Sequence, residues 1–419
     1  MTVECGGRAA QGKVCDGVCQ VRIAMIRLTL VHWLPLEQYP PACNMLRYFS
    51  AGGGYCVSCC TSIRADEQSA VSIPNVVLHR GSFPSGGGHV GTKLVELLAL
   101  LWQILKGLFL SRPDVILYVE PHSALPVALY LLLRRSTRLF IHYHEYRELS
   151  HFQDRGNLVA RLGRWCETAF LHRKAEWISH TNDDRLKMFL QDHAYVNPEV
   201  LHSLPNYPPD SWLPIISRSR IHCSESDSIR LVYVGALSLR DTFIQPLIEW
   251  IAAHRGGMRV RLDIYAGTMD AETRSFLESQ HLSTVQVFFA GVPYERLPEI
   301  LPQYDIGLIL YRGNSLNYRY NAPNKLFEYL LCGLDVWYPG QMPGIRPIAA
   351  SLSQQQVVEV NFDDHATMDR ELDAGFVRKP REWFSTCEHV LASLGGSIQR
   401  GSGSGASQGA SGPPGNQCV

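Results

Sequence analysis

The chain has 419 residues, of which 46% are hydrophobic and 19% are charged, so it can bury more than one core and is not disordered as a whole. That length suits two domains of roughly 150–200 residues each. Lysine plus arginine and aspartate plus glutamate both number 39. The zero net charge argues against a dedicated nucleic-acid binder, which would show a basic excess.

The cysteines and the amino terminus point to a cytoplasmic protein. Cys56 and Cys59 have the spacing of zinc ligands, but no second pair follows, and apolar filling of a strand is the simpler interpretation. The 12 cysteines form no disulfide framework, which fits a reducing compartment. Residues 1–20 lack the apolar core of a secretory signal, and we expect an unstructured leader there.

Strands and helices alternate over residues 21–205, and a loop signal at 32–35 ends the first strand. We predict strands at 21–31, 55–60, 76–79, 115–119 and 139–143, and helices at 43–50, 92–111 and 124–134. This alternation predicts a parallel sheet with helices on both faces, forming an N-terminal, acceptor-side domain.

A proline-rich break at 204–209 and the polar sequence after it predict a linker over 206–228. A second alternating series predicts a C-terminal domain over 229–375, with ligands at the carboxyl ends of its strands. Its strands are expected at 230–234, 260–266, 285–290, 306–311 and 335–338, and its helices at 243–254, 271–280, 294–301 and 324–332.

The end of the chain divides into a helix and a tail. We predict a C-terminal helix within 376–395, with an amphipathic pattern over 380–394 that includes Trp383 and Phe384. Residues 396–419 are rich in glycine and serine, and they cannot bury enough apolar surface to become ordered. We therefore expect a disordered tail.

The helix predicted at 324–332 carries the strongest functional signal. Pro323 suits the first helical turn, which leaves the N–H groups of Asn324, Lys325 and Leu326 unsatisfied. Together with the helix dipole and the Lys325 charge, these groups form an anion site suited to a diphosphate. Glu328 lies one turn further on, where a carboxylate can accept two hydrogen bonds from a ribose diol. An ordinary capped helix with a solvated glutamate is the alternative.

The run NKLFEYLLCGLDV at 324–336 resembles the donor-site helix of group 1 (family 4-like) retaining glycosyltransferases. YDIGL at 304–308 and VGAL at 234–237 resemble the strand and the glycine turn that accompany this helix. The resemblance implies the GT-B architecture, an α/β fold of two Rossmann-like domains whose parallel sheets face an interdomain cleft. It also implies that the second domain binds the donor and the first binds the acceptor, with retention of configuration.

Two positions depart from the family pattern. Tyr320 stands eight residues before Glu328, where the family has the first of two acids. Asp241 stands six residues after Gly235, where the family tends to have a base, and the neighbouring Arg240 is the nearest one. The expected donor-binding residues are Pro323, Asn324, Lys325, Leu326, Glu328, Gly235 and Arg319, and the expected catalytic bases at the phosphates are Lys325 and Arg240.

Polar residues also follow two strands of the first predicted sheet. We expect Glu120 and His122 to be catalytic, and His142, His144 and Glu145 to position an acceptor hydroxyl or to move a proton. A hydrogen-bonded loop cluster is an equally open interpretation. As a metal site, the histidine pair lacks a distant third ligand, and the sequence has no Asp-x-Asp motif, so we expect no metal and no cofactor.

These patterns predict a glycosyltransferase that moves a sugar from a nucleotide diphosphate sugar to a saccharide or lipid-linked acceptor, in glycan or cell-surface polysaccharide synthesis. A nucleotide-sugar epimerase or a phosphorylase of the same fold is one alternative. A binding or scaffold protein with a degenerate donor site is another. No nucleic-acid partner is expected.

Peripheral contact with a membrane is a further expectation. Basic residues lie near apolar helices of the first domain, where they would touch anionic headgroups if the acceptor is a lipid. They are Lys93, Lys106, Arg112, Arg134, Arg135 and Arg138. Residues 94–110 are interrupted by Glu96 and Lys106, so we predict a helix buried against a sheet there, and no membrane span.

Overall fold

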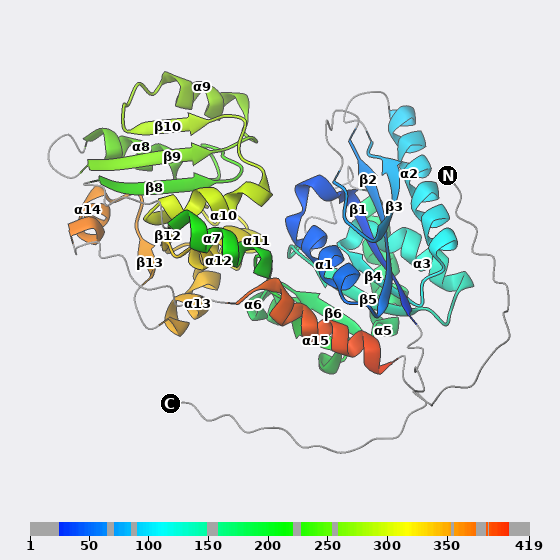
Figure 1. The fold of residues 1–419 in the computed structure, drawn as a ribbon. Coiled ribbons are helices and arrows are strands. Elements are labelled where there is room, and N and C mark those ends of the chain that lie inside the picture. The colour runs from blue at the N-terminus through cyan, green and yellow to red at the C-terminus, as the bar shows by residue number, and fades with distance from the viewer. Residues whose placement is uncertain are drawn as a thin grey trace, which may run out of the picture.

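The computed structural model describes residues 25–64, 71–84, 90–148, 158–220, 228–253, 259–352, 356–373, 383 and 385–401. They form two parallel sheets that lie in separate lobes with their own helices (Figure 1). Four hydrophobic clusters fill the faces of the two sheets, two for each sheet. The predicted leader at 1–20 lies outside the described residues.

The first sheet has seven strands in the order β3-β2-β1-β4-β5-β6-β7. The strands are β1 (Ile26–Pro35), β2 (Tyr55–Ile63), β3 (Val76–Ser82), β4 (Val115–Val119), β5 (Arg138–Tyr143), β6 (Trp177–His180) and β7 (Leu201–Ser203). All residues of β4 are buried because helices cover both faces of the sheet centre. The strand order reverses between β1 and β4, and open sheets of this kind bind ligands beside such a point.

The helices of this lobe are α1 (Pro40–Ala51), α2 (Val90–Ser111), α3 (Ala124–Leu133), α4 (Leu158–Cys166), α5 (His172–Lys174) and α6 (Asp183–Asp192). One face of the sheet packs against α1, through residues such as Leu46 and Phe49. The other face packs against α2 and α3, through residues such as Ile104 and Val127.

The second sheet has six strands in the order β10-β9-β8-β11-β12-β13. They are β8 (Ser228–Val234), β9 (Arg259–Tyr265), β10 (Val285–Phe288), β11 (Ile306–Leu308), β12 (Asp335–Pro339) and β13 (Val357–Val360). The helices that follow α6 are α7 (Leu213–Arg220), α8 (Ile244–Ala253), α9 (Ala271–Ser279), α10 (Leu297–Ile300), α11 (Leu316–Arg319), α12 (Asn324–Cys332), α13 (Arg346–Ser351), α14 (His365–Asp373) and α15 (Cys387–Arg400).

The helix α12 is held tightly against the second sheet. A Cβ atom added at Gly307 of β11 would collide with the ring of Tyr329, so only glycine allows the helix to come this close. The Tyr329 hydroxyl accepts a hydrogen bond from the Val234 N–H at 3.1 Å. These two contacts fix the start of α12 beside the carboxyl end of β8.

Two predictions about irregular segments are wrong. The expected loop at 32–35 belongs to β1, because side chains replace its missing ladder bonds: Ser123 Oγ accepts from the Trp33 N–H at 2.9 Å, and Ser62 Oγ donates to the Trp33 carbonyl at 2.8 Å. The expected linker at 206–228 contains α7, whose Ile216 is buried in the second lobe.

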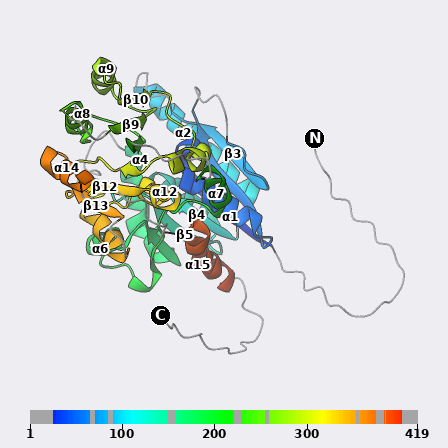
Figure 2. The same ribbon diagram turned by 60° about the vertical axis from the view of Figure 1, so that its left-hand side comes forward.

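The C-terminal helix also differs from its prediction. It begins at Cys387, after Trp383, and continues to Arg400, beyond the expected tail boundary at 396. Both views place α15 beside α1 (Figures 1 and 2), and its Leu394 and Ile398 are fully buried with the first-sheet cluster. The chain therefore returns to its first lobe. Phe384 and residues 402–419 lie outside the described residues.

Candidate functional site

The first turn of α12 lies at the carboxyl edge of the second sheet. Pro323 is the N-cap of the helix, and its carbonyl accepts the Leu326 N–H at 2.9 Å. The expectation of three unsatisfied N–H groups is thereby corrected, since within the described residues only those of Asn324 and Lys325 are left for a ligand. Gly333 ends the helix as its C-cap in the left-handed conformation, with φ 79°.

Lys325 is a buried cation between two aromatic rings. Its side chain is folded back over the end of β8, and the residue is only 7% exposed. Its Nζ lies 4.2 Å from the ring centroid of Tyr233 and 4.8 Å from that of Tyr311. Burial disfavours the charge, but the two tyrosines favour it more strongly and raise the pKa of Lys325 above its ordinary value. Among the described residues, Nζ has no hydrogen-bond partner.

Gly235 lies directly against this ammonium group. Its φ of +129° is a conformation that favours glycine, and a Cβ atom at this position would lie 2.9 Å from the Nζ of Lys325. The structure thus brings together two residues that the sequence assigned to the donor site and that stand 90 positions apart. A ligand phosphate near Gly235 could approach both the backbone and the ammonium.

Glu328 is a second buried charge on α12. It is 7% exposed, which argues against the alternative of an ordinary helix with a solvated glutamate. Burial raises the pKa of Glu328 to about 7, although the Lys325 charge lowers it in part. In the described part of the chain its carboxylate accepts no hydrogen bond, so its oxygens are available to a ligand diol.

The other predicted donor-site bases are exposed. Arg240 lies in the loop after β8, whose Asp241 carbonyl accepts the Arg312 N–H at 2.9 Å, and Arg319 ends α11. No contact between described residues joins either side chain to Lys325. Sequence reasoning missed Arg312, which directly follows the segment predicted as a strand and whose guanidinium lies 4.4 Å from the ring centroid of Phe243.

Glu120 of the first lobe holds a loop in place. It follows β4 with φ 68°, a strained value for this residue type. One carboxylate oxygen accepts the N–H groups of His144 and Glu145, at 2.8 and 3.1 Å, and the other pairs with Arg147 at 3.3 Å. The carboxylate is therefore committed to the 144–147 segment in this structure, and it is not an open acid or base. The neighbouring His122 is half-buried in the turn Pro121–Ser123.

The predicted histidines form a packed cluster. The His142 ring contacts Ser179 Oγ at 2.9 Å, and its centroid lies 4.7 Å from that of His144. Burial lowers the pKa of His144 to about 4 and that of His32 to about 3, so both are neutral at pH 7. The open alternative, a packed loop cluster, therefore describes His142 and His144. His32 was missed because it fell in the expected loop.

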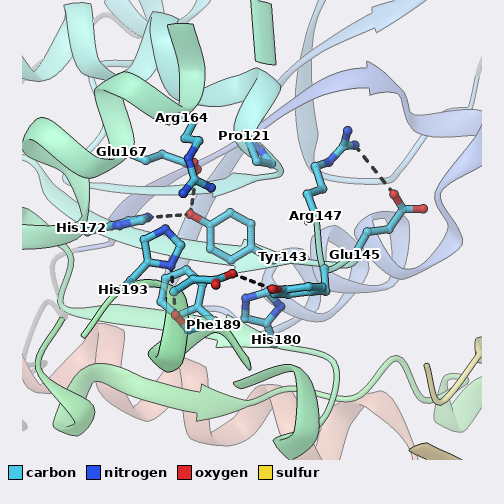
Figure 3. Close-up of a pocket in the computed structure, with 12 residues that line it drawn as sticks. Pro121, Tyr143, Glu145, Arg147, Arg164, Glu167, His172, His180, Phe189 and His193 are labelled. Carbon is cyan, nitrogen blue, oxygen red and sulfur yellow. Dashed lines mark hydrogen bonds and ion pairs between the residues drawn. The ribbon is translucent and has the colours of Figure 1, made fainter. Parts of the chain in front are cut away.

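A pocket opens beside this cluster, at the carboxyl ends of β5 and β6 (Figure 3). The Tyr143 hydroxyl donates to Glu167 at 2.7 Å and lies 3.0 Å from the Nε2 atom of His172. Burial raises the pKa of Glu167 to about 7, although hydrogen bonds from Tyr143 and Tyr118 lower it in part. The lining residues are Pro121, Tyr143, Glu145, Tyr146, Arg147, Arg164, Glu167, His172, His180, Phe189, Asp192 and His193.

Of the three predicted acceptor-side residues, only Glu145 lines this pocket. Sequence reasoning missed Glu167 and His172 because it assigned no element between 144 and 204. No group of three His, Cys, Asp or Glu residues in the described ranges is placed to hold a metal ion.

The pocket rim touches the second lobe. The Tyr146 N–H donates to Asn317 of α11 at 3.0 Å, and the buried Arg185 guanidinium donates to the Asn317 carbonyl at 2.9 Å. The Asn182 amide donates to the Tyr320 carbonyl at 2.8 Å. These bonds bring the carboxyl edges of the two sheets together.

The sequence matches no protein-family model and no curated protein. Solved structures do match. HepE from Anabaena, in complex with UDP-glucose, has a TM-score of 0.61 and 11% identity, over 90% of this chain and 99% of its own. Sucrose-phosphate synthase from Thermosynechococcus elongatus has a TM-score of 0.60 and 12% identity, over 90% of this chain and 98% of its own. This chain has the GT-B fold.

An epimerase shares this GT-B fold. The UDP-GlcNAc 2-epimerase from Neisseria meningitidis, bound to UDP-GlcNAc, matches with a TM-score of 0.54 and 10% identity, over 90% of this chain and 100% of its own. The GT-B prediction made from the sequence is confirmed. Because the identities are this low, the likeness establishes the fold, and the reaction must be argued from the site.

Proposed function

We propose that this protein is a glycosyltransferase that takes a sugar from a nucleotide diphosphate sugar and passes it to a saccharide or lipid-linked acceptor. The observation that carries the proposal is the meeting of Gly235, Lys325 and Glu328 at the carboxyl edge of the second sheet. Parallel α/β sheets bind their ligands at this edge. The UDP-glucose complex of HepE, which has the same fold, supports a nucleotide-sugar donor.

The proposed phosphate site consists of the Lys325 ammonium and the free N–H groups of Asn324 and Lys325. Negative charge grows on the leaving phosphate as the sugar departs. The helix N-terminus and the ammonium then stabilise the transition state more than the ground state. Arg240 would add a second positive charge. Retention of configuration and membership of the family 4-like group are supported by the resemblance of residues 324–336.

The proposed ribose site is the Glu328 carboxylate. It is buried and, within the described residues, unpaired, so it gains two hydrogen bonds when a diol arrives. Hydrogen bonds to a charged group contribute roughly 1.5–3 kcal/mol each. The first-lobe pocket next to Tyr146 supports an acceptor site on the opposite side, with Glu145 and Arg147 in its lining.

Calorimetry with UDP and with uridine tests this assignment. Glu328→Ala should weaken the binding of both ligands by about tenfold to a few hundredfold. Lys325→Ala should weaken the binding of UDP and leave that of uridine nearly unchanged, because only UDP carries the diphosphate. Glu278→Ala, at an exposed glutamate of α9, is the matched control.

If Glu328→Ala binds UDP as tightly as the parent protein does, the donor-site assignment is wrong. A thermal-shift screen with UDP, GDP, ADP and TDP first identifies the base. A ligand at 100 times its dissociation constant adds about 2.7 kcal/mol of stability.

An epimerase is the second candidate, favoured by the fold shared with UDP-GlcNAc 2-epimerases. Incubation with UDP-GlcNAc and no acceptor distinguishes the two reactions. A transferase should leave nearly all of the sugar nucleotide intact. Rapid formation of an isomeric sugar nucleotide, resolved by chromatography, would contradict the transferase proposal.

A further inference from the structure

The outer face of α2 is unusually apolar. Leu100, Ile104 and Leu108 recur every four residues and are buried against the first sheet, which fixes the inward side of the helix. The opposite side carries Trp102, which is 65% exposed, together with other exposed apolar residues. Such a helix would ordinarily place polar residues on its outer side.

Two neighbouring helices, α3 and α4, also expose apolar side chains. In α3, Leu133 is 72% exposed, and in α4, Trp165 is 67% exposed. The Phe109 and Tyr130 rings pack at 5.1 Å between α2 and α3, and α3 contacts α4 in turn. The exposed apolar residues of this layer are Leu94, Val95, Leu98, Trp102, Phe109 and Leu110 of α2, Leu129, Leu132 and Leu133 of α3, and Leu162 and Trp165 of α4.

We call these exposed apolar residues of α2, α3 and α4 the outer apolar layer. Exposed leucines scattered singly need no explanation, but a continuous apolar surface on adjacent helices marks a docking site. In Figure 1, α2 and α3 lie on the side of the first lobe away from the second lobe. Docking there would leave the donor site and the contacts between the lobes free.

The charged residues around the outer apolar layer indicate what kind of partner binds there. The three helices contain a single acidic residue, Glu96. Lys106 follows Trp102 by four residues and Arg161 precedes Trp165 by four, so each of these exposed bases shares a helix face with a tryptophan. Exposed bases also follow α2 and α3 directly, namely Arg112, Arg134 and Arg135.

Tryptophan beside lysine and arginine is typical of a membrane–water interface. The single acidic residue and the exposed bases give the layer a positive rim that complements anionic headgroups. We propose that the outer apolar layer docks on an anionic lipid bilayer. Trp102, Trp165 and the leucines enter the boundary between headgroups and acyl chains, while Lys106, Arg134 and Arg161 contact lipid phosphates.

The structure changes two expectations from the sequence, one about Arg138 and one about residues 94–110. Arg138 is not available to headgroups, because its guanidinium pairs with Glu176 at 2.6 Å and donates to the Ser397 carbonyl of α15 at 3.0 Å. Residues Leu94–Ser111 reach membrane-spanning length and hydropathy although they include Glu96 and Lys106, and only 22% of that window is buried, so the helix is more exposed than the sequence predicts. Its inward face nevertheless packs on the sheet, so the helix lies flat on the lobe.

Cosedimentation of the full chain with vesicles tests the proposal. The protein should bind phosphatidylcholine vesicles that contain phosphatidylglycerol, bind pure phosphatidylcholine weakly, and be released by salt. Trp102→Ser with Trp165→Ser should lower the partition coefficient at least tenfold. Lys106→Glu and Arg134→Glu should each lower it by about fivefold or more. Arg218→Glu on exposed α7 and Met25→Ser at an exposed apolar position are matched controls without effect.

Binding that ignores salt and lipid charge, or no binding to anionic vesicles, overturns the proposal. So does a dimer, detected by light scattering, that the tryptophan changes dissociate, because a second copy then covers the layer. If the tryptophan variant fails to fold, vesicle binding by Lys106→Glu and Arg134→Glu decides whether the proposal holds. The inference does not rest on the transferase proposal, since UDP binding in solution should be unchanged in all these variants.

Discussion

The carboxyl edges of the two sheets share a topology and differ in their chemistry. At the first edge, His32, His142 and His144 are buried, neutral and packed against one another. At the second edge, Lys325 and Glu328 are buried as a pair of ionisable groups without hydrogen bonds in the described part of the chain. Burying such a pair is costly, and groups with perturbed pKa values gather at functional sites. The three histidines also have buried ring nitrogens without hydrogen bonds in the described part of the chain, but they are neutral at pH 7, so the second edge differs by the positive charge of Lys325, which attracts a phosphate.

The largest effect that we expect is a loss of folding stability at acidic pH, caused by histidines of the first lobe. Burial lowers the pKa of six of its histidines below the ordinary value of about 6.5, so the unfolded chain binds more protons below that pH. The neutral histidines contribute stability above pH 6.5. This contribution is lost as the pH falls towards the pKa values that the histidines have in the folded protein. The six are His32, His142, His144, His172, His180 and His193, and burial also lowers the pKa of the less buried His79 and His202.

At pH 5, His32, His144 and His172, whose pKa values are lowered to about 3, 4 and 3, should each cost about 2 kcal/mol, and the other histidines act in the same direction. Glu167 and Glu328, whose pKa values are raised to about 7, act in the opposite direction and offset about two of the histidines. The net loss of several kcal/mol should lower the melting temperature steeply between pH 7 and pH 5. His144→Gln should make this dependence shallower, whereas the exposed His365→Gln on α14 should not. A melting temperature that does not change between pH 7 and pH 5 would contradict the claim that the first-lobe histidines are buried in the neutral form.

A smaller effect concerns the close approach at the second edge. Gly235→Ala places a methyl group 2.9 Å from the Lys325 Nζ and strains a φ of +129°, so the ammonium or the loop must move. We expect UDP affinity to fall by about tenfold to a hundredfold in calorimetry. Gly53→Ala, where no atom lies within 4 Å of the added group, is the control. If Gly235→Ala binds UDP as tightly as the parent protein does, Gly235 is not part of the donor site.

The smallest effect is the pH dependence of donor binding. A diol donates to the ionised carboxylate, and the pKa of Glu328 is about 7, so the ionised fraction rises about tenfold between pH 6 and pH 8. UDP and uridine affinities should rise together by up to about tenfold over this range. Glu328→Gln should bind more weakly and show no such rise. If the parent protein shows none either, the carboxylate does not hold the diol.

Well-capped elements could be predicted from the sequence. The limits of α12 and β4 were predicted to the residue, because Pro323 and Gly333 delimit the helix and a proline precedes the buried strand. The short strands β6 and β7 could not be recognised, since four and three residues are too few to show a period.

Contacts distant in sequence account for the other differences. The pairing of Tyr233 and Tyr311 around Lys325 follows from the strand order, which no local pattern encodes. The C-terminal helix was predicted to end by residue 395, but the Gly395 carbonyl accepts the Tyr55 hydroxyl at 3.2 Å inside α15, and tertiary packing outweighs the low helix propensity of glycine.

The return of α15 to the first lobe also has a consequence for synthesis. A ribosome completes amino-terminal domains first, and they generally fold as units while the chain is still growing. Here the surface around Leu46 and Phe49 receives its last partners, Leu394 and Ile398, only when the final residues emerge. The first lobe to be translated is therefore the last to be completed, and the nascent chain carries an uncovered apolar face through the translation of the whole second lobe.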